Sequence, residues 1–342
     1  MDGEGICAGE CMVGTKGITD DMSNNILILS CGTRDLLVRY FKRADYGRVI
    51  GADCSELAPA LYEADKYYLI PRMKEEGYFD AILEICRKEG ITAILPLQED
   101  ELNLISENRE LFEQEGIRTI VSPVETLQIC RDKYCFFEHM TEHGIPVLNS
   151  YIDLAKFEKA YEAGKIGFPV FVKPVRGAGS VGVMKVSCME LLKALFAYSE
   201  EPLLIQEFCN GREFGIDVYV DLVSGEVVDI FAKEKLRMRA GETEKSVTSN
   251  DPALKEFVYR AASTLKLSGP VDMDVFEKDG IFYLSEINPR FGGGFPHAYA
   301  CGVDTPSYIL QNLQGIANES HLQEKREEIY VLKYSDILCI DR

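Results

Sequence analysis

The stretch VDMDVFEKDGIFYLSEINPR, residues 271–290, carries two apolar runs that are separated by a turn-like Lys-Asp-Gly. This pattern predicts two antiparallel strands joined as a hairpin. A three-residue loop at 279–281 would place Asp274 directly opposite Glu286, on one face of the sheet. A two-residue loop would instead turn the two carboxylates to opposite faces, because side chains alternate along a strand. We predict the three-residue loop.

The same register would place Asp272 opposite Asn288, on the face that also carries the two carboxylates. Carboxylates that face each other on a sheet repel, so a cation between them would stabilise the arrangement. Ligands that all donate oxygen suit Mg²⁺ or Mn²⁺ rather than zinc. The sequence therefore predicts a metal site at Asp274, Glu286 and Asn288. The alternative is a solvated sheet face with scattered acids.

A glycine-rich loop, RGAGSVG at 176–182, follows an apolar strand that ends in Lys173. Backbone N–H groups that glycines leave exposed can cradle phosphate oxygens, and a neighbouring ammonium group supplies charge. Within the apolar run PVFVKP, the Lys173 side chain would be costly to bury without an anionic partner. The Walker sequence is absent. We predict a phosphate-binding loop of another kind, with a plain β-hairpin as the alternative.

Between these two features lies LLIQEFCNGREF, residues 203–214, an apolar strand that runs into a short polar hinge. Backbone groups of such a hinge can pair with the edge of a planar base. The carboxylate of Glu213 is placed to reach a ribose diol, although an exposed surface acid is the plain alternative. These residues extend the predicted phosphate site toward a nucleotide site.

The first third of the chain alternates short apolar strands with amphipathic helices from Asn24 onward. We predict strands at Ile26–Ser30 and Arg48–Asp53, with a helix over 33–43 between them. Such alternation is typical of an open, mostly parallel α/β sheet. The GxGxxG pattern of dinucleotide sites is absent. Further on, the antiparallel strands predicted between Glu213 and Lys235 indicate α+β character.

The chain has 342 residues with 37 basic and 56 acidic side chains, a net charge of −19. This charge repels nucleic acids and anionic lipid surfaces, and no apolar run is long enough to cross a membrane. Residues 1–23 lack the features of a signal peptide and predict a flexible leader. We therefore expect a cytoplasmic protein with reduced thiols. Cys7 and Cys11 could be half of a metal site, but no second pair completes it.

Together these motifs resemble the ATP-grasp superfamily, in the branch similar to short carbamoyl-phosphate synthetase large-subunit-like proteins and amino-acid ligases. The resemblance extends from Asn25 to about Asn318. It is carried by PALYEAD at 59–65, Asp132-Lys133, FPVFVKP at 168–174, the glycine loop, QEFCNGREF at 206–214 and EINPRFGGG at 286–294.

The resemblance implies an α/β and α+β protein with an ATP-grasp fold. An N-terminal Rossmann-like (pre-ATP-grasp) domain would cover 24–122, and the ATP-grasp domain would cover 123–342. Within the latter, a lid subdomain at about 150–207 would carry the glycine loop and face a C-terminal subdomain at about 208–342. ATP would be held between these two.

The resemblance also implies roles for matching positions. Lys133 and Lys173 match two lysines that bind the phosphates of ATP. Arg290 matches an arginine that faces the transferred phosphate or the substrate carboxylate. The other implied contacts are Gly177, Gly179, Ser180 and Gly182 in the loop, Gln206, Glu207 and Cys209 at the adenine hinge, Glu213 at the ribose, and Asp274, Glu286 and Asn288 at the metal.

Two positions leave alternatives open. Arg237, which we group with Arg290 and Lys173 as catalytic, lies in the basic stretch KEKLRMR at 233–239. That stretch could close over the γ-phosphate, or it could be a solvated charged strand. Gln206 departs from the acidic residue often found at its position, which leaves the contact to the adenine amino group open, although a glutamine carbonyl can accept it.

The resemblance implies an ATP-dependent carboxylate–amine ligase that works through an acyl phosphate with Mg²⁺ (or Mn²⁺) on small, amino-acid-like acids and amines. The alternatives are a carbamoyl-phosphate synthetase-like enzyme acting on bicarbonate and a catalytically inactive ATP-binding sensor. Substrates would bind near 98–101 and 291–297, where Glu101 could hold an amine or simply begin a helix. Neither nucleic acid nor membrane is an expected partner. The oligomeric state stays open, with a homodimer as the common default.

Overall fold

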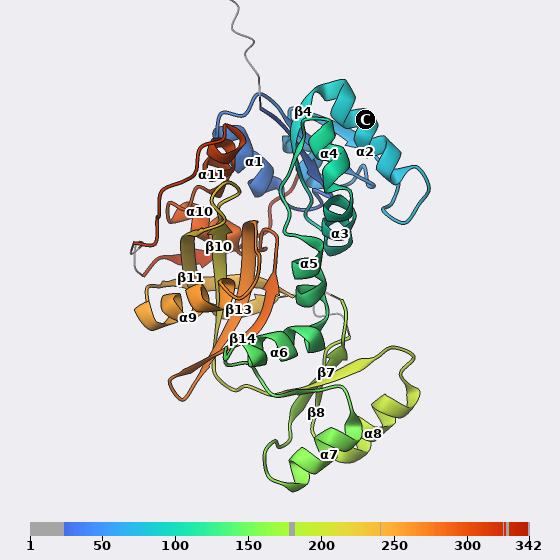
Figure 1. Ribbon diagram of the computed structural model, residues 1–342, viewed down its shortest axis with the longest axis vertical. Coiled ribbons are helices and arrows are strands. Elements are labelled where there is room, and N and C mark those ends of the chain that lie inside the picture. The colour runs from blue at the N-terminus through green and yellow to red at the C-terminus, as the bar shows by residue number, and fades with distance from the viewer. Residues whose placement is uncertain (1–23, 178–181, 240, 324, 326–327, 341–342) are drawn as a thin grey trace, which may run out of the picture.

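The computed structural model of the chain describes residues 24–177, 182–239, 241–323, 325 and 328–340. The predicted leader at 1–23, with Cys7 and Cys11, lies outside the described residues. Figure 1 shows three sheets that follow one another along the long axis of the molecule. None of the helices in the described part of the chain is both long and apolar enough to cross a membrane.

The N-terminal sheet is parallel and has the strand order β3-β2-β1-β4-β5. Its strands are β1 (Asn25–Leu29), β2 (Val49–Asp53), β3 (Lys66–Leu69), β4 (Ile91–Leu95) and β5 (Arg118–Thr119). Its helices are α1 (Asp35–Arg43), α2 (Tyr78–Glu89), α3 (Glu99–Glu107) and α4 (Arg109–Gln114). Strand β1 is buried along its whole length because helices cover both faces of such a sheet. The predicted α/β alternation is confirmed.

Two helices, α5 (Val124–Arg131) and α6 (Lys133–Glu142), lead out of this sheet. Helix α5 ends at Arg131, and a new helix starts at Lys133. The reason is Asp132, whose carboxylate accepts the backbone N–H groups of Tyr134 and Cys135 and so caps α6.

The lower sheet in Figure 1 has the order β6-β9-β7-β8 and carries helices α7 (Leu154–Glu162) and α8 (Met189–Tyr198). Its strands are β6 (Ser150–Tyr151), β7 (Val170–Pro174), β8 (Met184–Val186) and β9 (Leu203–Glu207). A small core of its own, centred on Phe157, holds the helices against the strands.

The largest sheet is antiparallel, with the order β14-β13-β10-β11-β12-β15. Its strands are β10 (Arg212–Val220), β11 (Val227–Arg239), β12 (Glu242–Ser249), β13 (Gly269–Lys278), β14 (Ile281–Asn288) and β15 (Tyr330–Leu332). Helices α9 (Pro252–Ala262), α10 (Phe295–Ala300) and α11 (Thr305–Leu313) complete this part.

The β13–β14 hairpin confirms the predicted pairing of Asp274 with Glu286, although its turn and its register differ from the predicted ones. The turn holds only two residues, Asp279 and Gly280, both with positive φ (54° and 75°), as tight hairpin turns prefer. The predicted three-residue loop is therefore wrong. However, a β-bulge leaves Ser285 without a partner on β13 and shifts the register by one residue. As a result, Asp274 still pairs with Glu286.

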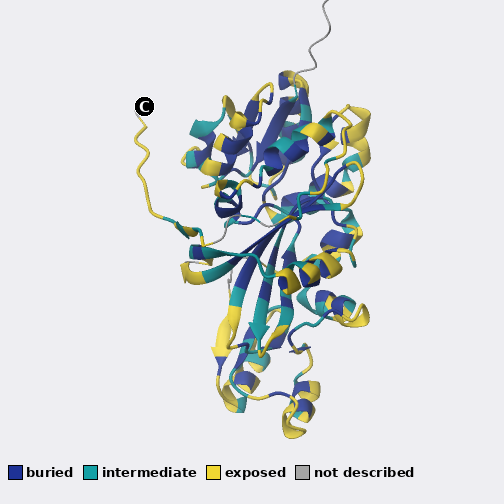
Figure 2. Cartoon of the chain, turned by 90° about the vertical axis from the view of Figure 1, so that its left-hand side faces the viewer, coloured by how far each residue is buried: buried dark blue, intermediate teal, exposed yellow. Residues whose placement is uncertain are grey.

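The N-terminal sheet and the large sheet share one hydrophobic core. Tyr40 of α1 stacks on Tyr299 of α10, with ring centroids 3.7 Å apart. Phe41 meets Phe291 edge-on at 5.9 Å. Buried residues accordingly run from the upper sheet into the upper part of the large sheet (Figure 2). This packing brings the start of α1 close to the glycines that follow β14.

Candidate active site

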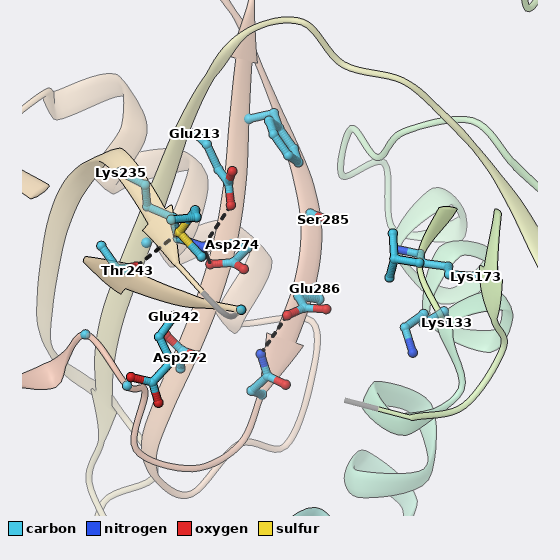
Figure 3. Close-up of a pocket in the computed structure, with 18 of the residues that line it drawn as sticks. Lys133, Lys173, Glu213, Lys235, Glu242, Thr243, Asp272, Asp274, Ser285 and Glu286 are labelled. Atoms are coloured by element: carbon cyan, nitrogen blue, oxygen red, sulfur yellow. Dashed lines mark hydrogen bonds and ion pairs between the residues drawn. The ribbon is translucent and has the colours of Figure 1, made fainter. Parts of the chain in front are cut away.

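A pocket of about 400 Å³ lies between the lower sheet and the large sheet. Strands β7 and β9 form one wall, and β10, β11, β13 and β14 form the other (Figure 3). Eleven of the site residues inferred from sequence line it, and these are Lys133, Lys173, Gly177, Gln206, Glu207, Cys209, Glu213, Asp274, Glu286, Asn288 and Arg290. Residues far apart in the chain thus meet in one place.

Two lysines form the cationic side of the pocket. Lys173 is buried, and its Nζ donates to Oε1 of Gln206 at 2.9 Å. Burial lowers the pKa of Lys173 to about 8. Lys133 donates to the backbone carbonyl of Gly177 at 2.6 Å, and burial lowers its pKa as well. Within the described residues, neither ammonium group has a carboxylate ion-pair partner, so both suit an anionic ligand such as a phosphate chain.

Both polar groups of the Gln206 side chain form hydrogen bonds within the protein. Its carbonyl accepts from Lys173, and its Nε2 donates to Oγ of Ser150 at 3.3 Å. The expected carbonyl contact to adenine would therefore compete with Lys173. At the next position, Glu207 accepts from Asn149 at 2.7 Å.

Carboxylates form the opposite wall. Oδ1 of Asp274 accepts from Nζ of Lys235 at 2.6 Å, and the same ammonium group donates to Oε1 of Glu213 at 2.8 Å. Oε1 of Glu286 accepts from Nδ2 of Asn288 at 3.1 Å. Burial raises the pKa of Asp274 to about 7, although Lys235 opposes the shift.

The donor set at this wall fits a hard cation. Among the described residues, no three His, Cys, Asp or Glu side chains converge as a ready metal cluster. The groups available to a metal ion are the carboxylates of Asp274 and Glu286 and the side-chain amide of Asn288, so each can offer an oxygen atom. Burial and the neighbouring carboxylates of Glu286 and Asp272 raise the pKa of Asp274 in spite of Lys235, and a divalent cation would offset this repulsion.

Lys235 is a lining residue that the sequence analysis overlooked, and Arg237 is a predicted site residue that lies outside the lining. Arg237 does not line the pocket; it is exposed and pairs with Glu244 at 2.8 Å. The pairing of β11 with β12 shifts on either side of Arg237, so Met238 faces the pocket instead. The sequence did contain a signal for Lys235. It lies two residues after Lys233, and residues two apart on a strand lie on the same face of the sheet.

The glycine loop at 176–182 is described only in part. Gly179 and Ser180 lie outside the described residues. Gly182 is described but does not line the pocket; its φ is +73°, and a Cβ there would stand 3.1 Å from the Pro174 ring.

The glycines that follow Arg290 in the sequence leave room for charged side chains. Arg290 donates to Asp272 at 3.0 Å. A Cβ on Gly292 would stand 2.4 Å from Oδ1 of Asp272, and one on Gly294 would stand 2.5 Å from Cε of Lys233. The run of glycines after β14 is therefore needed for these side chains to reach the pocket.

The N-terminal domain reaches this region through residues that the sequence analysis did not single out. Glu101 does not line the pocket; it is buried and accepts from the hydroxyl groups of Ser30 and Tyr78. Its neighbour Glu99 instead lines a smaller pocket of about 40 Å³ together with Lys133, Glu286 and Arg290. Helical periodicity alone could not decide which of the two acids faces the site.

Comparison with protein families agrees with this geometry. Residues 26–120 match the family described as PylC-like, N-terminal domain, and residues 199–337 match the family described as ATP-grasp in the biosynthetic pathway with Ter operon. The chain therefore has an ATP-grasp fold. The three-sheet fold also recurs in a solved biotin carboxylase domain of 2-oxoglutarate carboxylase from Hydrogenobacter thermophilus, in complex with MgADP, ADP and bicarbonate. That structure aligns with a TM-score of 0.72 at 20% identity and covers 90% of this chain and 73% of the other.

Two curated proteins show what the chain is similar to in sequence. The arginine-specific carbamoyl phosphate synthase large chain of Bacillus subtilis is 27% identical over 194 residues, or 53% of this chain. The D-alanine–D-alanine ligase of Geobacillus thermodenitrificans is 29% identical over 211 residues, or 54% of this chain. The chain spans 18% of the length of the first protein and 58% of the second.

Proposed function

We propose that this protein is an ATP-dependent ligase that joins a small carboxylate to an amine through an acyl phosphate. The observation that carries the proposal is the pocket in which two partly desolvated ammonium groups, Lys133 and Lys173, face an oxygen-donor wall at Asp274 and Glu286. Such a site binds a polyphosphate and compensates its charge on both sides. The similarity to D-alanine–D-alanine ligase favours amino-acid-like substrates.

The proposed reaction has two steps. An oxygen of the substrate carboxylate attacks the γ-phosphorus of ATP, which gives an acyl phosphate and ADP. The amine then attacks the acyl carbon, the C–O bond to phosphate breaks, and the nitrogen gives up a proton, leaving an amide and inorganic phosphate. No side chain has to form a covalent bond, so the protein contributes position and charge.

The residues of the pocket would have different roles in this reaction. Lys133 and Lys173 would orient the phosphates of ATP, and Arg290 would hold the group being transferred. Asp274, Glu286 and Asn288 would bind Mg²⁺ or Mn²⁺. A bound divalent ion supplies neutralisation of the phosphate charge. The strands β7 and β8 would close over the nucleotide and keep water from the acyl phosphate.

A second candidate function is a carbamoyl-phosphate synthetase-like reaction with bicarbonate as the acid, which the similarity to carbamoyl phosphate synthase favours. A catalytically inactive ATP-binding sensor is the third alternative. The cysteines of the described residues are all free thiols. A cytoplasmic location and a homodimer remain predictions.

The test is a phosphate-release screen with ATP and Mg²⁺ over all pairs of amino acids, with bicarbonate plus ammonia as a separate arm, followed by mass analysis of the products. We expect phosphate release that depends on one acid and one amine, together with an amide product. Release with bicarbonate alone would favour the second candidate. ATP binding without turnover in any arm would leave the sensor as the function.

A further inference from the structure

Glu99 is the one residue of the N-terminal domain that lines the smaller pocket, within the parts of the chain that the structure describes. Its helix α3 packs against α5, which leads to Lys133. Lys133, Glu286 and Arg290 line both this pocket and the large one, so the smaller pocket adjoins the proposed site of phosphate transfer. A volume of about 40 Å³ suits one polar group rather than a whole substrate.

Three consecutive acids begin α3, and their surroundings differ. Asp100 pairs with Arg131, and the buried Glu101 accepts from two hydroxyl groups. In contrast, the carboxylate of Glu99 faces the smaller pocket. The helix dipole favours acids in the first turn, but it applies to all three residues and does not explain why one of them lines a pocket.

Glu99 also differs from the other carboxylates of the two pockets. Among the described residues, its carboxylate has neither a hydrogen bond nor an ion pair. The other lining carboxylates all accept from a side chain, and these are Glu207, Glu213, Glu242, Asp272, Asp274 and Glu286. Glu99 is therefore the lining carboxylate that is available to a ligand.

The charges around Glu99 would change when a nucleotide binds. Burial raises the pKa of Glu99, and Glu286 adds to the shift. Arg290, Lys133 and Arg131 oppose it. In the proposed function, Lys133 and Arg290 face the phosphates of ATP and of the acyl phosphate. Glu99 is then a partly buried anion without a partner of its own, which favours a cationic group of the substrate beside it.

We propose, on the basis of the ligase function above, that Glu99 binds the amine substrate and takes its proton. The amine enters as an ammonium ion, and Glu99 accepts one proton, which frees the lone pair on nitrogen. The nitrogen attacks the acyl carbon, and the C–O bond to phosphate breaks. The second proton passes from nitrogen to the departing phosphate, and Glu99 returns its own proton to water. An amide and inorganic phosphate remain.

The chemistry of the two steps explains why a base is needed only for the amine. The substrate carboxylate attacks ATP as an anion and has no proton to lose. The amine cannot attack until a proton has left it, and a positioned carboxylate speeds this transfer. Glu99 lies beside Arg290, which would hold the transferred group, so the acyl phosphate would form next to it. Glu99 is thus placed for the second step.

The experiment separates the two steps with hydroxylamine. This nucleophile is largely uncharged near neutral pH and attacks acyl phosphates without a base, so the hydroxamate that it forms reports the first step alone. Each of the standard amino acids is tested as the acid with ATP, Mg²⁺ and hydroxylamine. The acid that gives a hydroxamate is then supplied with the amine found in the phosphate-release screen, and the amide is measured by mass analysis.

In Glu99→Gln, we expect amide formation to fall by roughly 100-fold or more, because the base is lost. Hydroxamate formation and KM for MgATP should stay unchanged. Glu99→Asp keeps a carboxylate and should retain part of the amide formation, which keeps the test valid if Glu99→Gln folds poorly. Glu107→Gln, the same exchange at the exposed end of α3, is the matched control and should change neither product.

The outcomes separate this inference from the proposed function. Normal amide formation in Glu99→Gln would overturn the inference alone. Equal losses of hydroxamate and amide in the Glu99 variants would also overturn it, because Glu99 would then serve phosphate transfer or the fold. Hydroxamate without any amide from the wild type would have the same effect. No hydroxamate from the wild type with any amino acid would count against the ligase function and this inference with it.

Discussion

Lys235 and Asp274 form an ion pair across an intervening strand: Nζ of Lys235 lies 2.6 Å from Oδ1 of Asp274, although β10 separates their strands β11 and β13. Gly215 of β10 lies between them, and a Cβ there would stand 3.1 Å from Cε of Lys235. The absence of a side chain on Gly215 lets the lysine pass over the sheet. The chain thus places a cation of its own beside a predicted metal ligand.

Removing that cation should destabilise the protein. Lys235→Met leaves the carboxylate of Asp274 in a largely buried place without its partner, which we expect to cost about 3 kcal/mol of unfolding free energy. Added Mg²⁺ should then raise the melting temperature more in the variant than in the wild type, because it restores positive charge at Asp274. Thermal unfolding with and without Mg²⁺ measures both effects.

Lys266→Met, at an exposed lysine, is the control and should change neither value. A Lys235→Met protein as stable as the wild type would show that Asp274 does not depend on Lys235.

Glu286→Gln should abolish turnover and leave the fold intact. One of two opposed carboxylates is removed, so the metal-free protein should be as stable as before or slightly more stable. The proposed metal loses a charged ligand, and we expect kcat to fall by roughly 100-fold or more. Steady-state phosphate release and thermal unfolding, measured on the same preparation, provide the comparison.

The matched control is Asp279→Asn in the β13–β14 turn, where the positive φ of 54° is one that asparagine tolerates. It should keep near-normal activity. An active Glu286→Gln enzyme would contradict the metal site.

Nucleotide binding should weaken in alkaline solution. Because burial lowers the pKa of Lys173 to about 8, the ammonium group of the free protein loses its proton above that pH and with it the attraction for phosphate. Gln206→Glu places a carboxylate next to Nζ, which should raise the pKa and move the loss to higher pH. Calorimetric titration with MgADP between pH 7 and pH 10 would show the difference.

The lowered pKa of Lys173 also makes the free energy of unfolding depend on pH. The pKa of Lys173 is lower in the folded chain than in the unfolded one, so the unfolded chain binds more protons above about pH 8. The cost of burying the charged lysine is fully present below pH 8 and disappears as the pH rises. Lys173→Met should therefore be more stable than the wild type at pH 7, and the gain should shrink toward pH 10. A pH-independent gain would contradict this explanation.

Gly292→Ala should disturb the Arg290–Asp272 pair. The new Cβ would stand 2.4 Å from Oδ1 of Asp272, so the carboxylate has to move, at a cost of roughly 1–3 kcal/mol. Because Arg290 then loses its orientation, kcat should fall together with the melting temperature. Gly167→Ala, where nothing lies within 4 Å of the new Cβ, is the control. Normal kcat in Gly292→Ala would show that the Asp272 contact does not position Arg290.

Much of the fold was predictable because it depends on local patterns. The alternation of apolar strands and amphipathic helices after Asn24 predicted the parallel sheet, since each element buries a face that its own periodicity defines. Strand β3 was missed because its sequence, KYYL, is mostly exposed at the sheet edge and shows little apolar pattern. The motif residues of the pocket could also be inferred, because the motifs that contain them resemble those of a known family.

The sequence by itself determined which residue types are available to the site: two lysines, an acid pair on adjacent strands, and a glycine run. Only the tertiary structure decided which of them face the pocket. The bulge at Ser285 kept Asp274 and Glu286 together, and the shifts around Arg237 turned that side chain outward. Glu99 adjoins the site because α3 packs against α5. A single inserted residue reverses every following side chain of a strand, and contacts between distant segments leave no local pattern.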